Sequence, residues 1–250
     1  MGSIPPSLNR CCLHPLMPPN VTAPFADPLP LTGVAVSAAR KAEFWDRTAR
    51  QYAADPIADP AGYETTVRRV QALLSPRHSV LELGCGTGTT ALRLAPFAGQ
   101  LLATDVSAGM IAIAQEKLLA QSVPNLSFAL GDADGPMAAP CTFDVVLAFN
   151  LLHLVADLDQ TLAHAVQALK PGGLLITKTP CIAEMNPLVP WLALPVMRAL
   201  GKAPHLLCLK GDAFTTAVAR QGLDILAVER HGSRGKDVRV FIVARKPMGN

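Results

Sequence analysis

Short apolar runs alternate with longer amphipathic segments between residues 78 and 180. The runs are bounded by glycine, proline or acidic residues, which is typical of buried strands. The pattern predicts strands at residues 80–83, 101–104, 126–130, 143–149 and 174–179. Helical patterns stand between these strands, so the sequence predicts an α/β fold with a largely parallel sheet.

Two further strands are expected after a helix at residues 211–222. They lie at residues 224–229 and 238–245, separated by the loop 230–237. This loop is too short for a crossover helix, so the last two strands must run antiparallel to each other.

A glycine-rich turn follows the first strand. Glu82 is followed by Gly84, Gly86 and Gly88, and a helical pattern begins at the next residue. Glycine adopts backbone conformations that other residues avoid, and it lets a ligand approach the main chain. A strand, a glycine turn and a helix N-terminus together predict a nucleotide-cofactor site. The dinucleotide pattern Gly-x-Gly-x-x-Gly does not fit, because its third glycine falls on Thr89.

Acidic residues also end the second and third strands. Asp105 stands where a carboxylate can accept both hydrogen bonds from a ribose diol. Ser107 is the expected N-cap of the next helix, with Met110 one turn inside it, and Asp132 follows the third strand. Met110 alone fits a core position and Asp132 alone fits a turn. Their order, each at the end of its own strand, favours a cofactor site.

The motifs together resemble a known family. Acidic-x-Gly-x-Gly-x-Gly at residues 82–88 resembles motif I of the class I S-adenosylmethionine (SAM) dependent methyltransferases. Asp-x-Ser-x-x-Met at 105–110, Gly-Asp-Ala at 131–133 and Leu-Lys-Pro-Gly-Gly at 169–173 are also typical of these enzymes. The resemblance covers about residues 42–246 and is strongest over 78–180. It implies a doubly wound seven-stranded sheet in the order 3-2-1-4-5-7-6, with strand 7 antiparallel and N-terminal cap helices. It also implies that SAM is the methyl donor.

The same resemblance implies which residues bind the cofactor. Met110 would lie against the adenine, Asp132 would accept a hydrogen bond from its amino group, and the backbone amide after Asp132 would reach the ring. Tyr52 would lie near the methionine moiety, with simple packing of Tyr52 against the sheet as an equal alternative. The expected cofactor-binding residues are Tyr52, Glu82, Gly84, Cys85, Gly86, Gly88, Asp105, Val106, Met110, Asp132, Ala133 and Phe149.

A catalytic residue is harder to assign. Methyl transfer requires positioning, exclusion of water and, for some acceptors, removal of a proton. His153 follows the fourth strand and is the candidate base, because imidazole titrates near neutrality; a packed or capping histidine is the alternative. Lys178 and Glu184 are weaker candidates. No acidic cluster follows the fourth strand, so no metal is expected. The sequence does not distinguish O-, N-, S- and C-methylation.

The segments outside the core have distinct compositions. Residues 1–37 are rich in proline and are expected to be a disordered leader, with the methyltransferase domain at 38–250. Cap helices are expected within 38–75, at residues 39–53 and 63–74. Residues 181–210 are expected to form an apolar lid insertion, centred on Pro187–Met197, with Trp191 and Leu194 contacting a partly hydrophobic acceptor. A surface patch that touches a membrane interface is the alternative.

The composition of the chain limits the classes of partner that it is expected to bind. The chain has 250 residues, a net charge of +3 and six cysteines without metal or disulfide spacing. These features favour a single-domain cytoplasmic enzyme that acts on a small molecule, without nucleic acid and without stable membrane insertion. The oligomeric state is not predicted. Two alternative functions stand beside methyl transfer: a non-catalytic SAM-binding protein and a nucleotide-dependent oxidoreductase. Thr89 and the terminal antiparallel pair argue against the oxidoreductase.

Overall fold

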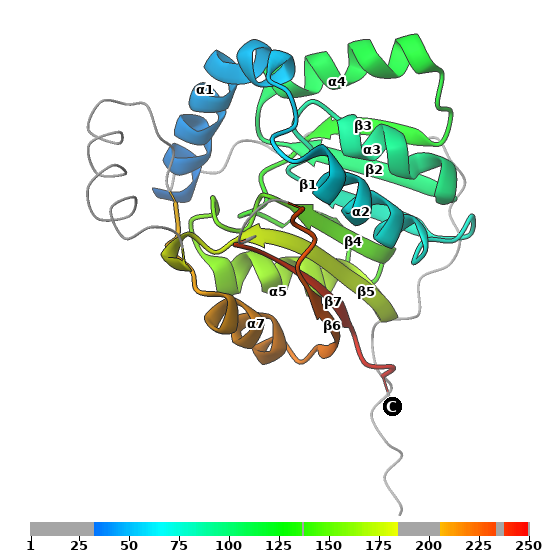
Figure 1. The fold of residues 1–250 in the computed structure, drawn as a ribbon, viewed down its shortest axis with the longest axis vertical. Helices are drawn as coiled ribbons and strands as arrows, with labels where there is room; N and C mark the ends of the chain where they lie inside the picture. Colours follow the sequence, from blue (N-terminus) through cyan, green and yellow to red (C-terminus); the bar gives the residue numbers. More distant parts are fainter. Residues whose placement is uncertain (1–32, 137, 185–205, 234–237, 250) are drawn as a thin grey trace, which may run out of the picture.

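The computed structural model describes residues 33–136, 138–184, 206–233 and 238–249 (Figure 1). The helices are α1 Gly33–Ala54, α2 Pro60–Gln71, α3 Thr89–Leu94, α4 Ala108–Gln121, α5 Leu158–Ala168 and α7 Gly211–Arg220. The strands are β1 Ser79–Leu83, β2 Gln100–Asp105, β3 Leu126–Leu130, β4 Phe143–Phe149, β5 Leu169–Pro180, β6 Asp224–Glu229 and β7 Arg239–Arg245.

The seven strands form one sheet in the order β3-β2-β1-β4-β5-β7-β6. The pairs among β1 to β5 are parallel, whereas β7 runs antiparallel to both β5 and β6. The expected fold class and strand order are therefore confirmed. Because β1 to β4 are parallel, their carboxyl ends lie at one edge of the sheet, where the predicted cofactor residues follow them.

Helices cover both faces of the sheet, which explains the continuous apolar runs of the central strands. In β4, Val145 and Leu147 pack into a core with residues of α2, α3 and α4. Val146 and Ala148 point the other way, into a core with α5 and α7. Figure 1 shows α2 and α3 over one face and α5 and α7 over the other. All four of these strand residues are almost completely buried.

Both N-terminal helices begin earlier than expected. Helix α1 begins at Gly33 rather than near Ala38, because the segment after the last leader proline, Pro30, is rich in alanine and free of proline. Helix α2 begins at Pro60, and the Asp59 carboxylate caps it by accepting a hydrogen bond from the Gly62 amide at 3.0 Å. Proline suits the first helical turn because it has no amide hydrogen to leave unpaired. The sequence pattern predicts a later start, near Tyr63, because the apolar periodicity begins only there.

The fifth strand also begins earlier than the expected residue 174. Leu169 already pairs with Phe143 of β4, and the next pair is Leu174 with Val145. The register therefore shifts across the Lys170–Gly173 turn, where Gly172 has a φ of +78°. The glycine turn interrupts the pairing of β5 without ending the strand.

Several predicted features lie outside the described residues. These are residues 1–32 of the leader and residues 185–205 of the lid insertion, which include Trp191 and Leu194. Within the described part of the chain, no helix is long and apolar enough to cross a membrane.

Candidate functional site

A cavity lies at the carboxyl edge of the parallel strands. Every predicted cofactor-binding residue except Gly88 lines it. They come from the ends of β1, β2 and β4, the loop after β3, and helices α1 and α4. The structure therefore brings together residues that are separated by up to about a hundred positions in the chain.

The glycine turn shapes one wall of this cavity. Gly84, Gly86 and Gly88 have φ values of +63°, +54° and +73°, which side-chain-bearing residues rarely adopt. A Cβ at Gly86 would meet only the Tyr52 ring, at 3.7 Å, whereas a Cβ at Gly88 would lie 2.6 Å from the Phe128 ring. Gly86 therefore keeps the cavity open, and Gly88, the N-cap of α3, allows that helix to pack closely against its neighbours.

Asp105 connects the glycine turn with the loop after β2. Its Oδ2 accepts a hydrogen bond from the Gly86 amide at 2.8 Å, and its Oδ1 accepts one from the Ser107 amide at 2.9 Å. Burial raises the pKa of this carboxyl above its usual value, although these backbone hydrogen bonds oppose the shift. Each carboxylate oxygen has a second lone pair, so the group can still accept hydrogen bonds from a diol.

Glu82 lies deeper in the same cavity. The residue is 2% exposed, and its Oε2 has no hydrogen-bond partner among the described residues. Burial, together with the charge of Asp105, raises the pKa of Glu82 to about 8. The carboxyl is therefore protonated at pH 7 in the free protein, and a bound cation would favour its ionised form.

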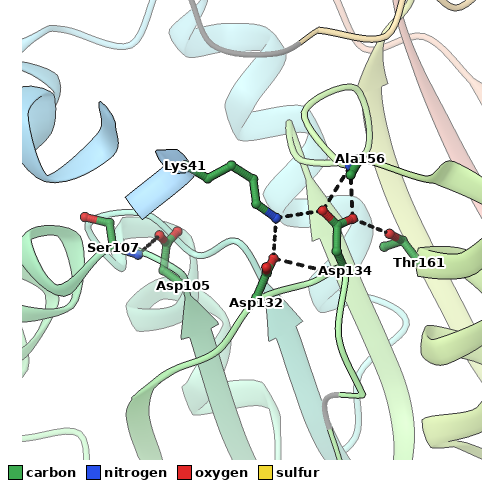
Figure 2. A network of polar contacts seen from close by, with 7 residues as sticks. All are labelled: Lys41, Asp105, Ser107, Asp132, Asp134, Ala156 and Thr161. Carbon is green, nitrogen blue, oxygen red and sulfur yellow. Dashed lines mark hydrogen bonds and ion pairs between the residues drawn. The ribbon is translucent and has the colours of Figure 1, made fainter. Parts of the chain in front are cut away.

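A lysine of α1 pairs with Asp132, the acidic residue that follows β3. Lys41 Nζ donates to Asp132 Oδ1 at 2.5 Å and to Asp134 Oδ2 at 2.6 Å. Asp134 also accepts hydrogen bonds from the Ala156 amide and from Thr161 Oγ1, so it ties α1, the loop after β3 and the start of α5 together (Figure 2). Neither Lys41 nor Asp134 is predicted from the sequence, since their contact spans 93 positions and follows no local pattern.

Asp134 gives a test of this network. Burial raises its pKa, but hydrogen bonds from Lys41, Ala156 and Thr161 outweigh burial and lower it below the usual 3.8. We expect Asp134→Asn to lower the free energy of unfolding by about 1–3 kcal/mol, because the amide places donor hydrogens against existing donors. The stabilisation is present above pH 4 and is lost as the pH falls through the lowered pKa.

Urea unfolding at pH 7 and at pH 3 measures both effects. Asp159→Asn is the matched control, because Asp159 pairs with Arg220 on the surface, where both side chains are more than half exposed. Such a pair contributes little to stability. Equal losses in the two variants at pH 7 would contradict the role of Asp134.

Helix α4 begins as predicted. Ser107 Oγ accepts a hydrogen bond from the Met110 amide at 3.0 Å, which confirms Ser107 as the N-cap. Asp46 of α1 accepts hydrogen bonds from Ser107 Oγ and from the Gly109 amide. Met110 is 2% exposed and lines the cavity, so it is both a core residue and part of the site.

A second cavity adjoins the first. Its volume is about 370 Å³, and it lies among the loop 55–59, helix α2 and the carboxyl ends of β4 and β5. Its walls carry apolar side chains such as Ile57, Val67 and Val70 beside polar ones such as Asn150 and Lys178. The residues that line both cavities are Tyr52, Cys85, Thr90, Phe149 and Asn150.

The structure does not bring His153 to either cavity. Leu151 and Leu154 line the first one, but His153 lines neither; it is 9% exposed. Burial lowers its pKa to about 4. Its Nδ1 has no hydrogen-bond partner among the described residues. A buried side chain that lines neither cavity fits the alternative of a packed histidine better than the role of a base.

The two weaker candidates for a catalytic residue, Glu184 and Lys178, lie in different surroundings. Glu184 Oε1 accepts a hydrogen bond from the Gly211 amide at 2.6 Å, and its Oε2 pairs with Arg230 at 3.0 Å, so it supports the start of α7. Lys178, at the end of β5, is 5% exposed and lines the second cavity. No group of three or more His, Cys, Asp or Glu side chains in the described ranges is arranged to hold a metal ion.

Comparisons with known proteins identify the core segment. Residues 80–173 match a family model described as a methyltransferase domain. A stretch of 120 residues is 36% identical to the hybrid PKS-NRPS synthetase mpsA of Macrophomina phaseolina and covers 43% of this chain but 3% of that protein. A stretch of 126 residues is 35% identical to the iterative polyketide synthase afoE of Emericella nidulans and covers 46% of this chain and 4% of that protein. The chain thus spans a small part of these relatives.

Solved structures share the whole fold. The [4+2]-cyclase SpnF superposes with a TM-score of 0.65 and 18% identity, covering 84% of this chain and 96% of that chain. A SAM-dependent methyltransferase from Mesorhizobium loti superposes with a TM-score of 0.61 and 19% identity, covering 75% of this chain and 99% of that chain. At these identities the likeness shows the fold alone. Residues 80–173, which resemble a methyltransferase domain, thus supply the central strands of a sheet with the order β3-β2-β1-β4-β5-β7-β6.

Proposed function

We propose that this protein transfers a methyl group from SAM to a small, partly hydrophobic acceptor, in the cytoplasm and without a metal. One observation carries the proposal: the predicted cofactor residues, with Gly88 as the exception, line one cavity at the carboxyl edge of the sheet. In open α/β sheets, ligands bind outside the carboxyl ends of the strands.

The cavity residues fit the parts of SAM. Asp105 retains free lone pairs for the ribose hydroxyls, and Gly86 leaves the main chain open to the ligand. Asp132 can share its carboxylate between Lys41 and the adenine amino group, since one carboxylate accepts about four hydrogen bonds. The unpartnered Glu82 Oε2 can face the cationic end of the cofactor. When bound, SAM supplies an electrophilic methyl group on a sulfonium.

The protein's own contribution is to position both reactants and exclude water. Tyr52, Phe149 and Asn150 stand between the cofactor cavity and the second cavity, so an acceptor in the second cavity would meet the cofactor across them. His153 as the base stays a prediction that the geometry does not support. The lid with Trp191 also stays a prediction.

Two measurements test the function. Calorimetric titration of the purified protein with SAM, NAD(H) and NADP(H) separates a methyltransferase from an oxidoreductase, and we expect binding of SAM alone. A screen for S-adenosylhomocysteine release over small phenols, acids, thiols and amines then tests catalysis. Binding of SAM without release of S-adenosylhomocysteine for any acceptor would favour a non-catalytic SAM-binding protein. The [4+2]-cyclase SpnF shares this fold, and a fold alone does not fix a reaction.

Glu82 predicts that SAM binding is linked to a proton. With its pKa at about 8, this carboxyl holds its proton at pH 7 in the free protein. The positive charge of SAM favours the ionised carboxylate, so binding should release a proton and SAM affinity should rise between pH 6 and pH 8, by up to about tenfold per pH unit. Above pH 8 the rise should level off, because the free carboxyl is already ionised.

Calorimetry in two buffers of different ionisation enthalpy counts the released proton. Glu82→Gln is the matched variant, since it keeps the shape of the side chain and cannot titrate. It should bind SAM with a smaller proton release and a flatter pH profile. Identical proton release in the wild-type protein and in Glu82→Gln would show that another group is responsible.

A further inference from the structure

A chain of four polar side chains leads from the surface to the second cavity. Glu229 Oε2 lies 2.8 Å from His231 Nε2, and His231 Nδ1 lies 3.0 Å from Thr66 Oγ1. Lys178 Nζ donates to the same Thr66 oxygen at 2.8 Å. These residues come from α2, the end of β5, the end of β6 and the segment that follows it, so no local motif assembles them.

Three of the four side chains are buried. His231, Thr66 and Lys178 are 8%, 6% and 5% exposed, and Glu229 at the outer end is also paired with Arg69. Burial raises the pKa of Glu229, but the hydrogen bonds from His231 and Arg69 outweigh it and keep this carboxylate ionised. The ionised Glu229 orients the His231 ring, which also packs on Phe241 at 4.4 Å, and the ring in turn fixes the Thr66 hydroxyl.

This chain of contacts holds Lys178 at the wall of the cavity. Thr66 also donates to the Gly62 carbonyl or to His231, so its hydroxyl is held from several sides. A side chain with a fixed partner loses less entropy when it binds a ligand. The ammonium of Lys178 is therefore preorganised beside the space that an acceptor would occupy.

The other charged groups on this cavity are engaged elsewhere or lie at its outer rim. The Asp59 carboxylate accepts hydrogen bonds from the Gly62 amide and from both the amide and the hydroxyl of Ser233. Asp55 lies on the exposed loop and accepts from Gln51. Arg239 also lines the cavity, and its charge acts on Asp59.

We propose that the second cavity binds the methyl acceptor and that Lys178 pairs with a negatively charged oxygen of it, so that the acceptor is an oxyanion with an apolar body. The inference rests on the proposed function. Ile57, Val67 and Val70 provide the apolar wall, and a buried ammonium attracts an oxyanion far more strongly than an exposed one does. A volume of about 370 Å³ suits a small molecule. His231 and Thr66 are positioning residues that act through Lys178.

The experiment compares carboxylates with amides of the same shape. The full-length protein is saturated with S-adenosylhomocysteine, and ligand-observed NMR titrations then use benzoate with benzamide, 3-phenylpropionate with 3-phenylpropanamide, and octanoate with octanamide. For at least one pair, we expect the carboxylate to bind about tenfold or more tightly than its amide. Absence of any such preference in the wild-type protein would overturn the inference.

Variants then test whether Lys178 and the side chains that hold it cause this preference for the carboxylate. Lys178→Met keeps the length of the side chain without its charge and should abolish the preference, whereas Lys178→Arg should retain part of it. His231→Phe keeps the ring packing and should reduce the preference without abolishing it. Lys170→Met is the control, because Lys170 pairs with Asp144 at the opposite edge of the sheet and should leave the preference unchanged. A preference that persists in Lys178→Met would also overturn the inference.

A further variant tests the cavity without touching the buried lysine. Ile57 lies on the exposed loop and lines the cavity, so Ile57→Trp should block carboxylate binding even if Lys178→Met does not fold. Carboxylate binding that survives Ile57→Trp would show that the site lies elsewhere. Affinity for S-adenosylhomocysteine should stay within about twofold in all variants. Failure of the wild-type protein to bind S-adenosylhomocysteine would instead contradict the proposed function, and the acid and amide pairs can then be compared on the free protein.

Discussion

Replacing Asp105 with alanine should weaken SAM binding by about ten- to a hundredfold. The carboxylate is expected to accept hydrogen bonds from the ribose diol, and a hydrogen bond to a charged group contributes about 1.5–3 kcal/mol. The same carboxylate orders the glycine turn through the Gly86 amide and the next loop through the Ser107 amide. The variant therefore loses both a ligand contact and the preorganisation of the cavity wall. Calorimetric titration with SAM measures the change.

Asp144→Ala is the matched control for this prediction. Asp144 Oδ2 accepts hydrogen bonds from the Ser79 amide and from Lys170, so it also joins a backbone amide to a side chain. It stands at the start of β4, at the opposite edge of the sheet from the cavity. We expect a comparable loss of stability but unchanged SAM affinity in Asp144→Ala. SAM affinity that is the same in Asp105→Ala as in the wild-type protein would remove Asp105 from the cofactor site.

The grouping of the strand-end residues around the first cavity was predictable from the sequence, because parallel strands bring their carboxyl ends together. Residues that follow the carboxyl ends of β1, β2, β3 and β4 must meet at one edge, whatever the loops between them do. Glu82, Asp105 and Asp132 each stand at such an end, and each lines the cavity. Tyr52 came from the family resemblance, and the structure places it on the same cavity.

The contacts between helices and distant loops were not predictable in the same way. In the sequence, Lys41 is an ordinary polar residue of an amphipathic helix. It contacts Asp132 and Asp134 only because of the way α1 lies over the carboxyl ends of the strands. His153 illustrates the same limit for a residue that was predicted. It stands only four residues after the end of β4, yet it is buried and does not line the cavity. Sequence position alone does not give the direction of a side chain in a turn.

Lys178 shows that a residue can be predicted from the sequence while its partners cannot. Its place at the end of β5 made it a candidate, but the residues that hold it, Thr66 and His231, come from α2 and from the segment after β6. Such a set has no spacing that a single sequence can reveal. Only the packing of α2 beside the β5 and β7 strands shows that the four side chains form one chain of contacts.

The glycines of motif I should separate stability from binding. In Gly88→Ala, the added Cβ would lie 2.6 Å from the Phe128 ring and 2.8 Å from the Ala114 Cβ, at a φ of +73°. Left-handed strain costs about 1–2 kcal/mol and overpacking costs about 1–3 kcal/mol. We therefore expect the free energy of unfolding to fall by about 2–5 kcal/mol, which lowers the Tm by roughly 5–15 °C for a domain of this size.

Gly86→Ala is the matched variant, because its φ of +54° imposes similar strain while its Cβ meets only the Tyr52 ring, at 3.7 Å. It should lose about 1–2 kcal/mol of stability but weaken SAM binding by about tenfold or more, since the new methyl group occupies the cavity wall that the ligand approaches. Gly88 does not line the cavity, so the folded fraction of Gly88→Ala should bind SAM nearly as the wild-type protein does. Thermal unfolding measures the stability of both variants, and calorimetric titration measures their affinity for SAM. If Gly86→Ala bound SAM normally, the ligand would not lie against this turn, and the cavity would have to bind its cofactor by the strand-end carboxylates alone.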